Sequence, residues 1–195
     1  MNNCQPTKAY LGNLAYQWDI LCRHNSEKIA TILGLANIKD NSRILDIATG
    51  TGILIPHLLN YEPEEIIAID LSELIIRQAQ KNYKQSKVKF EDVNFYQYNQ
   101  TGFDFAIVYN AYPHFADKEA FARQLSSCLN SGGRFMIAHS ESKEIFNARR
   151  SEERIRKVTS SLDDAVTESK HFNALFDIDI RVDGDELYII SGIKL

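Results

Sequence analysis

The sequence has few cysteines and no long apolar run. Its three cysteines, Cys4, Cys22 and Cys128, lie far apart and form no C-x-x-C pair. That spacing predicts neither a zinc site nor a disulfide framework, and it is typical of reduced thiols in a cytosolic protein. No stretch approaches the roughly 18 apolar residues of a membrane span, and the first residues lack the apolar centre of a signal peptide. We therefore predict a cytoplasmic protein with no metal site and no membrane partner.

The sequence also has no excess of positive charge. Its formal net charge is −4, from 22 Lys and Arg residues against 26 Asp and Glu residues. Domains that bind nucleic acid usually carry a basic patch, so this balance argues against a nucleic-acid partner. The cations that gather at 149–157 are interspersed with glutamates, as on an ordinary solvated helix face.

What the sequence does have is a regular alternation of strand and helix patterns. Short apolar or alternating runs predict strands at 44–47, 65–71, 88–94, 103–111 and 134–140. Amphipathic runs predict helices, of which the clearest are 72–83, with Ser72 as its N-cap, and 117–130, closed by Ser131-Gly132-Gly133. Strands that alternate with helices predict a doubly wound, mainly parallel α/β sheet with helices on both faces.

The C-terminal residues depart from this alternation. The stretch "FDIDIRVDGDELYIISGIKL" at 176–195 holds two alternating runs joined at Asp183-Gly184-Asp185. Asp-Gly between alternating hydrophobic residues is a strong hairpin signal. The sheet is therefore predicted to end in an antiparallel hairpin, which brings the expected number of strands to seven.

The chain length favours a single domain, residues 1–195. Its expected parts are a helical cap at 1–41, a cofactor-binding core at 42–140, a helical insert at 141–173 and the terminal hairpin at 174–195. The charged insert has two interpretations, a solvated amphipathic helix pair or a lid over the substrate. The aromatic residues of the cap either fold over the sheet edge or pack in an ordinary way.

The stretch "LDIATGTGIL" at 45–54 joins a buried strand to a helix through a glycine turn. Gly50 and Gly52 permit backbone angles closed to other residues and let a nucleotide-like ligand approach the main chain. The alternative is a tight connection that binds nothing. A dinucleotide-binding turn would need a third glycine at position 55, which is Ile. Asp70, at the end of the second strand, is placed to accept hydrogen bonds from both ribose hydroxyls.

Four stretches together carry a family resemblance. "ILDIATGTGIL" resembles the D-x-G-x-G-x-G motif of class I S-adenosylmethionine-dependent methyltransferases, and "IIAIDLS" resembles their second-strand acid. "FDFAIVYNAYPHF" is similar to their fourth strand and its loop, and "LNSGGRFMIAHS" to the lead into their fifth strand. The terminal hairpin matches the family's antiparallel seventh strand. The whole looks most like the small methyltransferase-domain proteins of bacteria.

The resemblance implies S-adenosylmethionine as the cofactor and assigns the first turn to it. Asp46 is then the acid that closes the first strand, near the amino end of the cofactor. Ala48, Gly50 and Gly52 form the turn itself. Ala48 stands where the family has its first glycine, and a methyl group is tolerable there if the backbone angle is ordinary.

The resemblance also assigns residues to the nucleoside. Asp70 takes the ribose diol, and Leu71 lies against the adenine ring. The family usually has an Asp after its third strand, near the adenine amino group, and that place falls on Asn94, followed by Phe95. An Asn carbonyl accepts from an amine equally well, although Asp92 is a rival two residues away.

The remaining candidates lie toward the transferred methyl group. Asn110 ends the fourth strand, under the methionine portion of the cofactor. In-line methyl transfer needs mainly alignment, and a general base is needed only when the acceptor is protonated. His114 and His139, which follow the fourth and fifth strands, are candidates for a base or an orienting group, and Tyr112 is a candidate for the acceptor pocket. Ordinary packing in a loop is the alternative for both histidines.

Three functions remain open at this point. The first is a methyltransferase that acts on a small molecule held in an enclosed pocket. The second is a methyltransferase that acts on protein or RNA, and the third is a non-catalytic module that binds an adenosyl ligand. The order Asn-Ala-Tyr-Pro at 110–113 departs from the Asn-Pro-Pro-Tyr motif of amino-methyltransferases, which disfavours planar amino acceptors.

Overall fold

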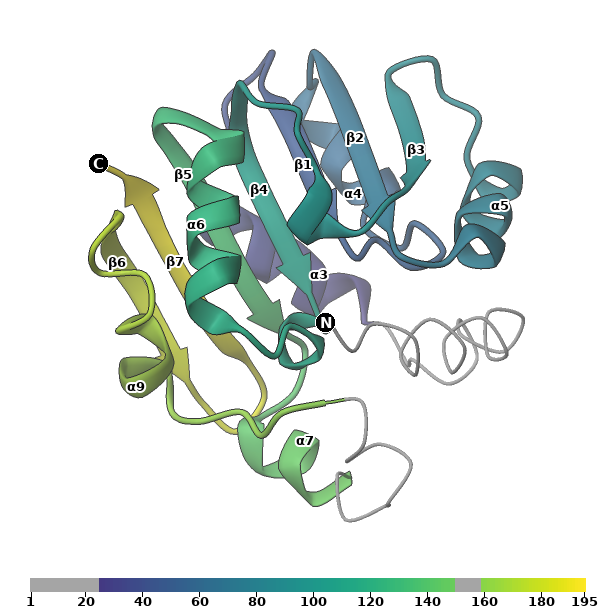
Figure 1. Cartoon of the computed structure of the whole chain (residues 1–195). Helices are drawn as coiled ribbons and strands as arrows, with labels where there is room; N and C mark the ends of the chain where they lie inside the picture. The colour runs from purple at the N-terminus through teal and green to yellow at the C-terminus, as the bar shows by residue number, and fades with distance from the viewer. Residues whose placement is uncertain (1–24, 150–158) are drawn as a thin grey trace. The chain divides into compact units, whose positions relative to one another are not determined.

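A computed structural model describes residues 25–149 and 159–195 (Figure 1). The chain divides into two compact units, Met1–Tyr98 and Asn99–Leu195, and each is described by itself below. Most of the predicted N-terminal cap, with its aromatic residues, lies outside the described residues. The division into cap, core, insert and hairpin stays a prediction. No helix in the described ranges is long and apolar enough to cross a membrane.

Seven strands follow the order β3-β2-β1-β4-β5-β7-β6. Their bounds are β1 Arg43–Ile47, β2 Glu65–Asp70, β3 Val88–Asp92, β4 Phe103–Tyr109, β5 Leu129–His139, β6 Phe176–Asp183 and β7 Tyr188–Lys194. The β1–β2, β2–β3 and β4–β5 pairs are parallel, whereas β7 pairs antiparallel with both β5 and β6. The predicted seven-stranded α/β sheet with a terminal antiparallel hairpin is therefore confirmed.

In the first unit, helix α3 Ser26–Leu35 precedes β1, and α4 Ile55–Leu58 and α5 Glu73–Asn82 connect the parallel strands β1, β2 and β3. Two short 3-10 turns follow α4 and β3, η1 Leu59–Tyr61 and η2 Phe95–Gln97. Ser72 is the N-cap of α5, as predicted, but its hydroxyl makes no capping hydrogen bond. Leu74, an apolar residue of α5, is 56% exposed. Ile75, Ile76 and Ala79 are buried instead, because the buried stripe is centred one residue further along the helix.

The second unit holds η3 Tyr112–His114, α6 Lys118–Cys128, α7 Lys143–Arg149 and α9 Ala165–Ser169. Helix α6 begins at its N-cap Asp117, whose Oδ1 accepts from the Ala120 N–H at 2.8 Å. The predicted helix end at Ser131-Gly132-Gly133 is wrong, because β5 begins at Leu129 and contains all three residues. Gly133 is needed there for space, since an added Cβ would lie 2.9 Å from the Asn130 carbonyl oxygen.

The terminal hairpin packs its inner face on an aromatic core within the second unit. The Gly184 N–H donates to the Leu187 carbonyl at 3.0 Å and closes the turn between β6 and β7. Phe135 of β5 stacks on Phe172 with ring centroids 4.9 Å apart, and Phe176 of β6 meets Phe135 edge-on at 4.7 Å. Helix α9 lies against β6 and β7 (Figure 1). The packing thus joins the end of the predicted insert to the hairpin.

Candidate functional site

The first unit brings two buried carboxylates to the carboxyl ends of neighbouring parallel strands. Asp46 lies in β1 and Asp70 ends β2, and their side chains are 1% and 5% exposed. In an open α/β sheet, ligands bind at this edge of the strands. The turn of Thr49, Gly50 and Thr51 that follows β1 is buried beside them.

Asp46 is tied to the turn by one short hydrogen bond. The Thr49 hydroxyl donates to Asp46 Oδ2 at 2.6 Å. Burial disfavours the charged form and raises the pKa of Asp46 to about 7, and the neighbouring charge of Asp70 adds to this rise. Asp46 is therefore poised to exchange a proton near neutral pH.

Asp70 links the glycine turn to the start of α5. Its Oδ2 accepts from the Gly50 N–H at 3.1 Å, and its Oδ1 accepts from the Ser72 N–H at 3.0 Å. Burial raises the pKa of Asp70, while these backbone hydrogen bonds oppose the rise. The sequence predicted only that Asp70 binds the ribose. The structure shows that Asp70 also ties the glycine turn to the start of α5.

The backbone of the turn corrects one expectation and explains one glycine. Ala48 has a φ of +57°, in the left-handed region, so the ordinary angle assumed for its methyl group is wrong. A left-handed residue with a side chain costs about 1–2 kcal/mol. Gly50 and Gly52 have φ of +59° and +88°. An added Cβ at Gly52 would lie 2.8 Å from the Tyr83 ring, so protein packing as well as backbone angle requires that glycine.

The candidates for the adenine ring lie at the same edge of the first unit. Asn94 caps η2, because its Oδ1 accepts from the Tyr96 N–H at 3.1 Å. Phe95 is buried, and Leu71 is half-buried beside Asp70. Asp92 pairs in register with Asp70 across β2 and β3. The predicted residues of the first unit are therefore gathered around the ends of β1, β2 and β3.

The chemistry of these residues fits a nucleoside. Each carboxylate has about four lone-pair sites, and the donors from Thr49, Gly50 and Ser72 leave acceptor capacity on Asp46 and Asp70. Ribose hydroxyls and an ammonium group are donors that match such acceptors. No group of three or more His, Cys, Asp or Glu side chains within 25–149 and 159–195 is placed to hold a metal ion.

In the second unit, Asn110 ties the end of β4 to the end of β5. The Ser140 N–H donates to Asn110 Oδ1 at 2.9 Å, and Asn110 Nδ2 donates to Ser140 Oγ at 3.0 Å. Its φ of +55° is one that Asn tolerates better than most residues. Asn110 therefore fixes the direction in which the chain leaves β4.

Tyr112 lies in the core of the second unit. It is 0% exposed, its hydroxyl donates to Glu168 Oε2 at 3.0 Å, and its ring meets Phe121 edge-on with centroids 5.6 Å apart. Burial and the negative charge of Glu168 raise the pKa of Tyr112 far above its ordinary value. These contacts fix Tyr112, the first residue of η3, in the core of the second unit.

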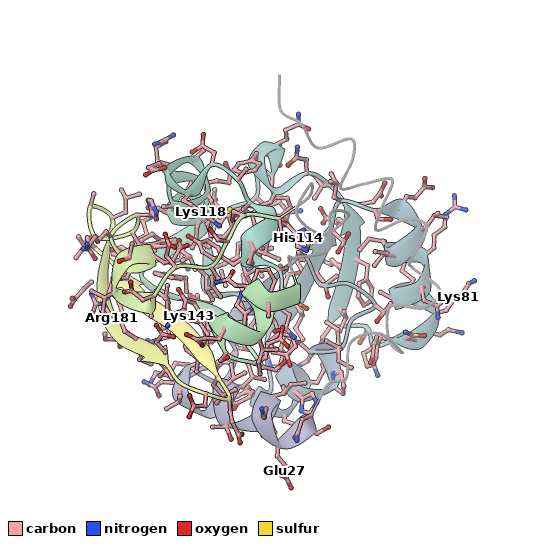
Figure 2. The ribbon with its side chains drawn as sticks, turned by 90° about the horizontal axis from the view of Figure 1, so that it is seen from below. Glu27, Lys81, His114, Lys118, Lys143 and Arg181 are labelled. Atoms are coloured by element: carbon pink, nitrogen blue, oxygen red, sulfur yellow. The ribbon has the colours of Figure 1, made fainter. Side chains whose placement is uncertain are left out.

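The two candidate histidines have different surroundings. His114 ends η3 and is half-buried (Figure 2). Its backbone N–H donates to the Ala111 carbonyl at 3.0 Å. His139 ends β5 and is 1% exposed, with its ring packed edge-on against Phe146 and Tyr188. Of the two, His114 has the exposure that a general base needs.

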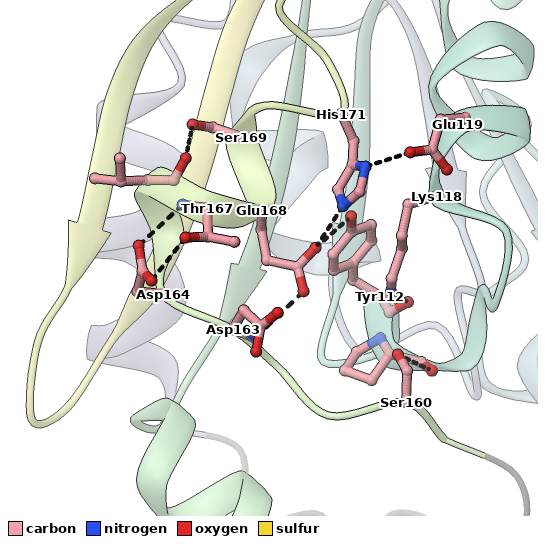
Figure 3. Close-up of polar contacts among 12 residues, drawn as sticks. Tyr112, Lys118, Glu119, Ser160, Asp163, Asp164, Thr167, Glu168, Ser169 and His171 are labelled. Carbon is pink, nitrogen blue, oxygen red and sulfur yellow. Dashed lines mark hydrogen bonds and ion pairs between the residues drawn. The ribbon is translucent and has the colours of Figure 1, made fainter.

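Two charged residues of this region were missed by the sequence analysis. Glu168 is 4% exposed and Lys118 is 8% exposed, and both lie beside Tyr112 (Figure 3). Lys118 Nζ lies 3.6 Å from the centroid of the Tyr112 ring and donates to the Tyr112 carbonyl at 3.2 Å. Burial lowers the pKa of Lys118 to about 8. No local pattern could have found Glu168, because it is 56 residues from Tyr112.

Known proteins match this chain in sequence and in fold. A family model described as a methyltransferase domain matches residues 38–186. An uncharacterized methyltransferase of Schizosaccharomyces pombe is 28% identical over 112 residues, which are 51% of this chain and 39% of that protein. The chain spans only 39% and 21% of the lengths of the curated relatives that it matches.

Solved structures share the fold over nearly the whole chain. The complex of DhpI with SAH superposes with a TM-score of 0.78 at 15% identity, over 97% of this chain and 96% of that one. A chain from a complex that contains the Trm112 methyltransferase activator of Haloferax volcanii also has a TM-score of 0.78, at 13% identity, over 94% and 97%. At identities of 13% and 15%, the likeness shows a shared fold alone. The family match confirms the predicted methyltransferase class, and the solved structures share its fold.

Proposed function

The chain belongs to the methyltransferase-domain family, and on this premise we propose that it transfers a methyl group from S-adenosylmethionine to a small-molecule acceptor. The observation that supports the proposal most is the pair of buried carboxylates, Asp46 and Asp70, that flank the glycine turn in the first unit. The net charge of −4 disfavours a nucleic-acid acceptor. The cytoplasmic location stays a prediction.

In this proposal the first unit binds the nucleoside. Asp70 accepts from the ribose hydroxyls with the lone pairs that its backbone donors leave. Leu71 and Phe95 contact the adenine ring, and Asn94 or Asp92 accepts from its amino group. Asp46 lies near the cofactor's ammonium group, where a cation favours the ionised carboxylate and lowers its pKa.

The residues that we propose for acceptor chemistry belong to the second unit. S-adenosylmethionine, when bound, supplies an electrophilic methyl group on a sulfonium and leaves as a neutral thioether. Asn110 orients the chain after β4 through its hydrogen bonds to Ser140. His114 accepts the acceptor's proton at a ring nitrogen when the acceptor is protonated, a contribution of about 10²–10⁴-fold.

A protein acceptor is the second candidate. It is favoured by the match to a ribosomal protein L11 methyltransferase of Acetivibrio thermocellus, which is 31% identical over 65 residues. An acceptor protein would dock on the surface rather than enter an enclosed pocket. The two candidates predict label in different fractions of a cell extract.

The test uses labelled S-adenosylmethionine and separate metabolite, protein and RNA extracts. We expect label in the metabolite fraction only, and formation of S-adenosylhomocysteine in the same sample. The Asp70→Ala variant is the control, because it removes the proposed ribose acceptor and should abolish the label. Label only in the protein or RNA fraction, lost in the same variant, would replace the small-molecule acceptor with a macromolecule.

A further inference from the structure

A buried polar cluster in the second unit centres on the carboxylate of Glu168 (Figure 3). Glu168 Oε2 accepts from the Tyr112 hydroxyl at 3.0 Å, and Oε1 accepts from the Asp163 N–H at 3.3 Å. His171 Nε2 lies 3.9 Å from Oε2, and His171 Nδ1 lies 2.7 Å from Glu119 Oε1. One carboxylate therefore joins helix α9 to the turn that follows β4.

Lys118 is the positive member of this cluster. Its ammonium group is buried against the Tyr112 ring, and the charges of Glu168 and Asp163 partly offset the effect of burial on its pKa. A buried ammonium group is costly to keep charged unless negative charge lies near it. An apolar residue of similar shape at position 168 could fill the same space. Only a carboxylate there offers both an acceptor to the Tyr112 hydroxyl and a negative charge near Lys118.

The cluster holds the η3 turn at successive residues. Tyr112 is bound through its hydroxyl by Glu168 and through its carbonyl by Lys118. The Pro113 carbonyl accepts from the Ser160 N–H at 2.8 Å and from the Ser160 hydroxyl at 3.1 Å. The next residue is His114, whose N–H closes the turn on the Ala111 carbonyl. Every residue before His114 in the turn is thus fixed from outside.

The segment that makes these contacts is itself anchored. Asn147 of α7 exchanges two hydrogen bonds with Leu162, in which its Nδ2 donates to the carbonyl at 2.8 Å and its Oδ1 accepts from the N–H at 3.0 Å. Asp164 caps α9 by accepting from the Thr167 N–H at 2.9 Å. Residues 159–168 therefore form a rigid support for η3.

We infer that Glu168 is a positioning residue for methyl transfer, which acts through Tyr112 to hold the η3 turn and the His114 side chain in place. The inference rests on the proposed function, because it assigns a purpose to the turn beside the acceptor. A displacement of about 1 Å in a catalytic group can cost about 10²-fold in rate. A turn of three residues has too few internal hydrogen bonds to supply that rigidity alone.

Two buried tyrosines of the second unit provide a matched pair of variants. Tyr112 and Tyr188 are both 0% exposed, and each loses one hydroxyl on substitution by Phe. The Tyr112 hydroxyl bonds to Glu168, whereas the Tyr188 hydroxyl has no hydrogen-bond partner among the described residues. Tyr112→Phe breaks the link to the turn, and Tyr188→Phe removes the same atom without breaking it. Glu168→Gln tests the charge itself.

The first measurement is hydrogen exchange at the His114 and Phe115 amides, both of which close η3. We expect exchange to be about 3- to 10-fold faster in Tyr112→Phe and Glu168→Gln, the range for one lost hydrogen bond, and unchanged in Tyr188→Phe. Urea unfolding of each variant checks that the fold is retained. Unchanged exchange in Tyr112→Phe would overturn the inference, whether or not the protein transfers methyl groups.

The second measurement separates positioning from a general loss of structure. Dissociation constants for S-adenosylhomocysteine should stay within about twofold in all three variants, because the ribose and adenine candidates lie in the first unit. Single-turnover transfer from bound S-adenosylmethionine to the metabolite extract should fall about 10- to 100-fold in Tyr112→Phe and Glu168→Gln only. Equal losses of binding and transfer would overturn the positioning role. A wild-type protein that transfers no label would contradict the proposed function, and the exchange data would still decide whether Glu168 holds the turn.

Discussion

The two units bury acidic side chains under different electrostatic conditions. In the first unit, Asp46 and Asp70 are buried near each other, and burial raises the pKa of each. Neither forms an ion pair in the part of the chain that the structure describes. In the second unit, the buried Glu168 has the buried Lys118 and the Tyr112 hydroxyl beside it. The first arrangement suits a site that receives a cationic ligand, and the second suits a fixed support.

The turns that leave the strands show the same contrast. Ala48 after β1 and Asn110 after β4 both adopt left-handed φ angles. The cost of the left-handed backbone at Asn110 is offset by two hydrogen bonds from its side chain to Ser140. The Ala48 methyl group has no such compensation, because it cannot hydrogen-bond. The predicted cofactor turn therefore carries uncompensated backbone strain at Ala48.

The largest expected effect breaks the support in the second unit. Glu168→Ala should lower the free energy of unfolding by about 3–5 kcal/mol, because it leaves a cavity and a buried Tyr112 hydroxyl without its acceptor. Urea unfolding measures the loss. Glu73→Ala is the control, since the Glu73–Arg77 pair is exposed and should contribute about 0.3–0.5 kcal/mol. Similar losses in the two variants would contradict the comparison.

The next effect concerns the pH dependence of the first unit. The folded pKa of Asp46 is about 7, above its ordinary value of 3.8, so the folded state binds more protons between these values. The free energy of unfolding should therefore fall as the pH rises from about 4 to about 7. Asp46→Asn cannot ionise but keeps an acceptor for Thr49, so it should be more stable than wild type by about 2–4 kcal/mol at pH 8.

Urea unfolding of both proteins at several pH values measures this difference. The advantage of Asp46→Asn should shrink as the pH is lowered and be absent well below pH 3.8, where the wild-type carboxyl is protonated in both states. An advantage that does not change with pH would show that Asp46 is not the titrating group. S-adenosylhomocysteine should bind the variant more weakly if the ammonium group contacts Asp46.

A third effect tests the two tasks of Asp70. Asp70→Ala should weaken S-adenosylmethionine binding by about 1.5–3 kcal/mol, roughly 10- to 150-fold, the range for hydrogen bonds to a charged group. Asp70→Asn should not restore affinity fully, because its amide nitrogen would face a backbone N–H of Gly50 or Ser72. Calorimetry measures both. S-adenosylmethionine should raise the melting temperature of the wild type, and nicotinamide dinucleotides should leave it unchanged. A rise with nicotinamide dinucleotides but not with S-adenosylmethionine would contradict the cofactor assignment.

The smallest effect concerns the strained turn. Ala48→Gly should stabilise the protein by about 0.5–1 kcal/mol, because Gly adopts a left-handed φ without a clash and loses part of that gain as chain entropy. Ala148→Gly, on the exposed side of α7, should destabilise it by a similar amount. Thermal unfolding compares the two. The same sign for both substitutions would remove the argument from backbone strain.

Local patterns predicted much of the fold. The apolar runs of β1, β2 and β4, the Asp-Gly hairpin and the absence of a third glycine at Ile55 are properties of neighbouring residues. They could be predicted because burial repeats with a fixed period in strands and helices, and because a tight turn constrains its own residues. The same patterns predicted that the Asp46 turn and Asp70 lie at one edge of the sheet.

The tertiary structure alone decided the tasks of particular side chains. Gly52 is constrained by Tyr83, Tyr112 is held by Glu168, and His139 is enclosed by Tyr188. Each partner is distant in sequence, so no local periodicity specifies the contact. The sequence by itself determined the order of strands and helices and the terminal hairpin, because those depend on adjacent residues, although it misplaced the start of β5. Which side chain faces a ligand and which supports another depends on packing and desolvation, and these exist only once distant segments meet.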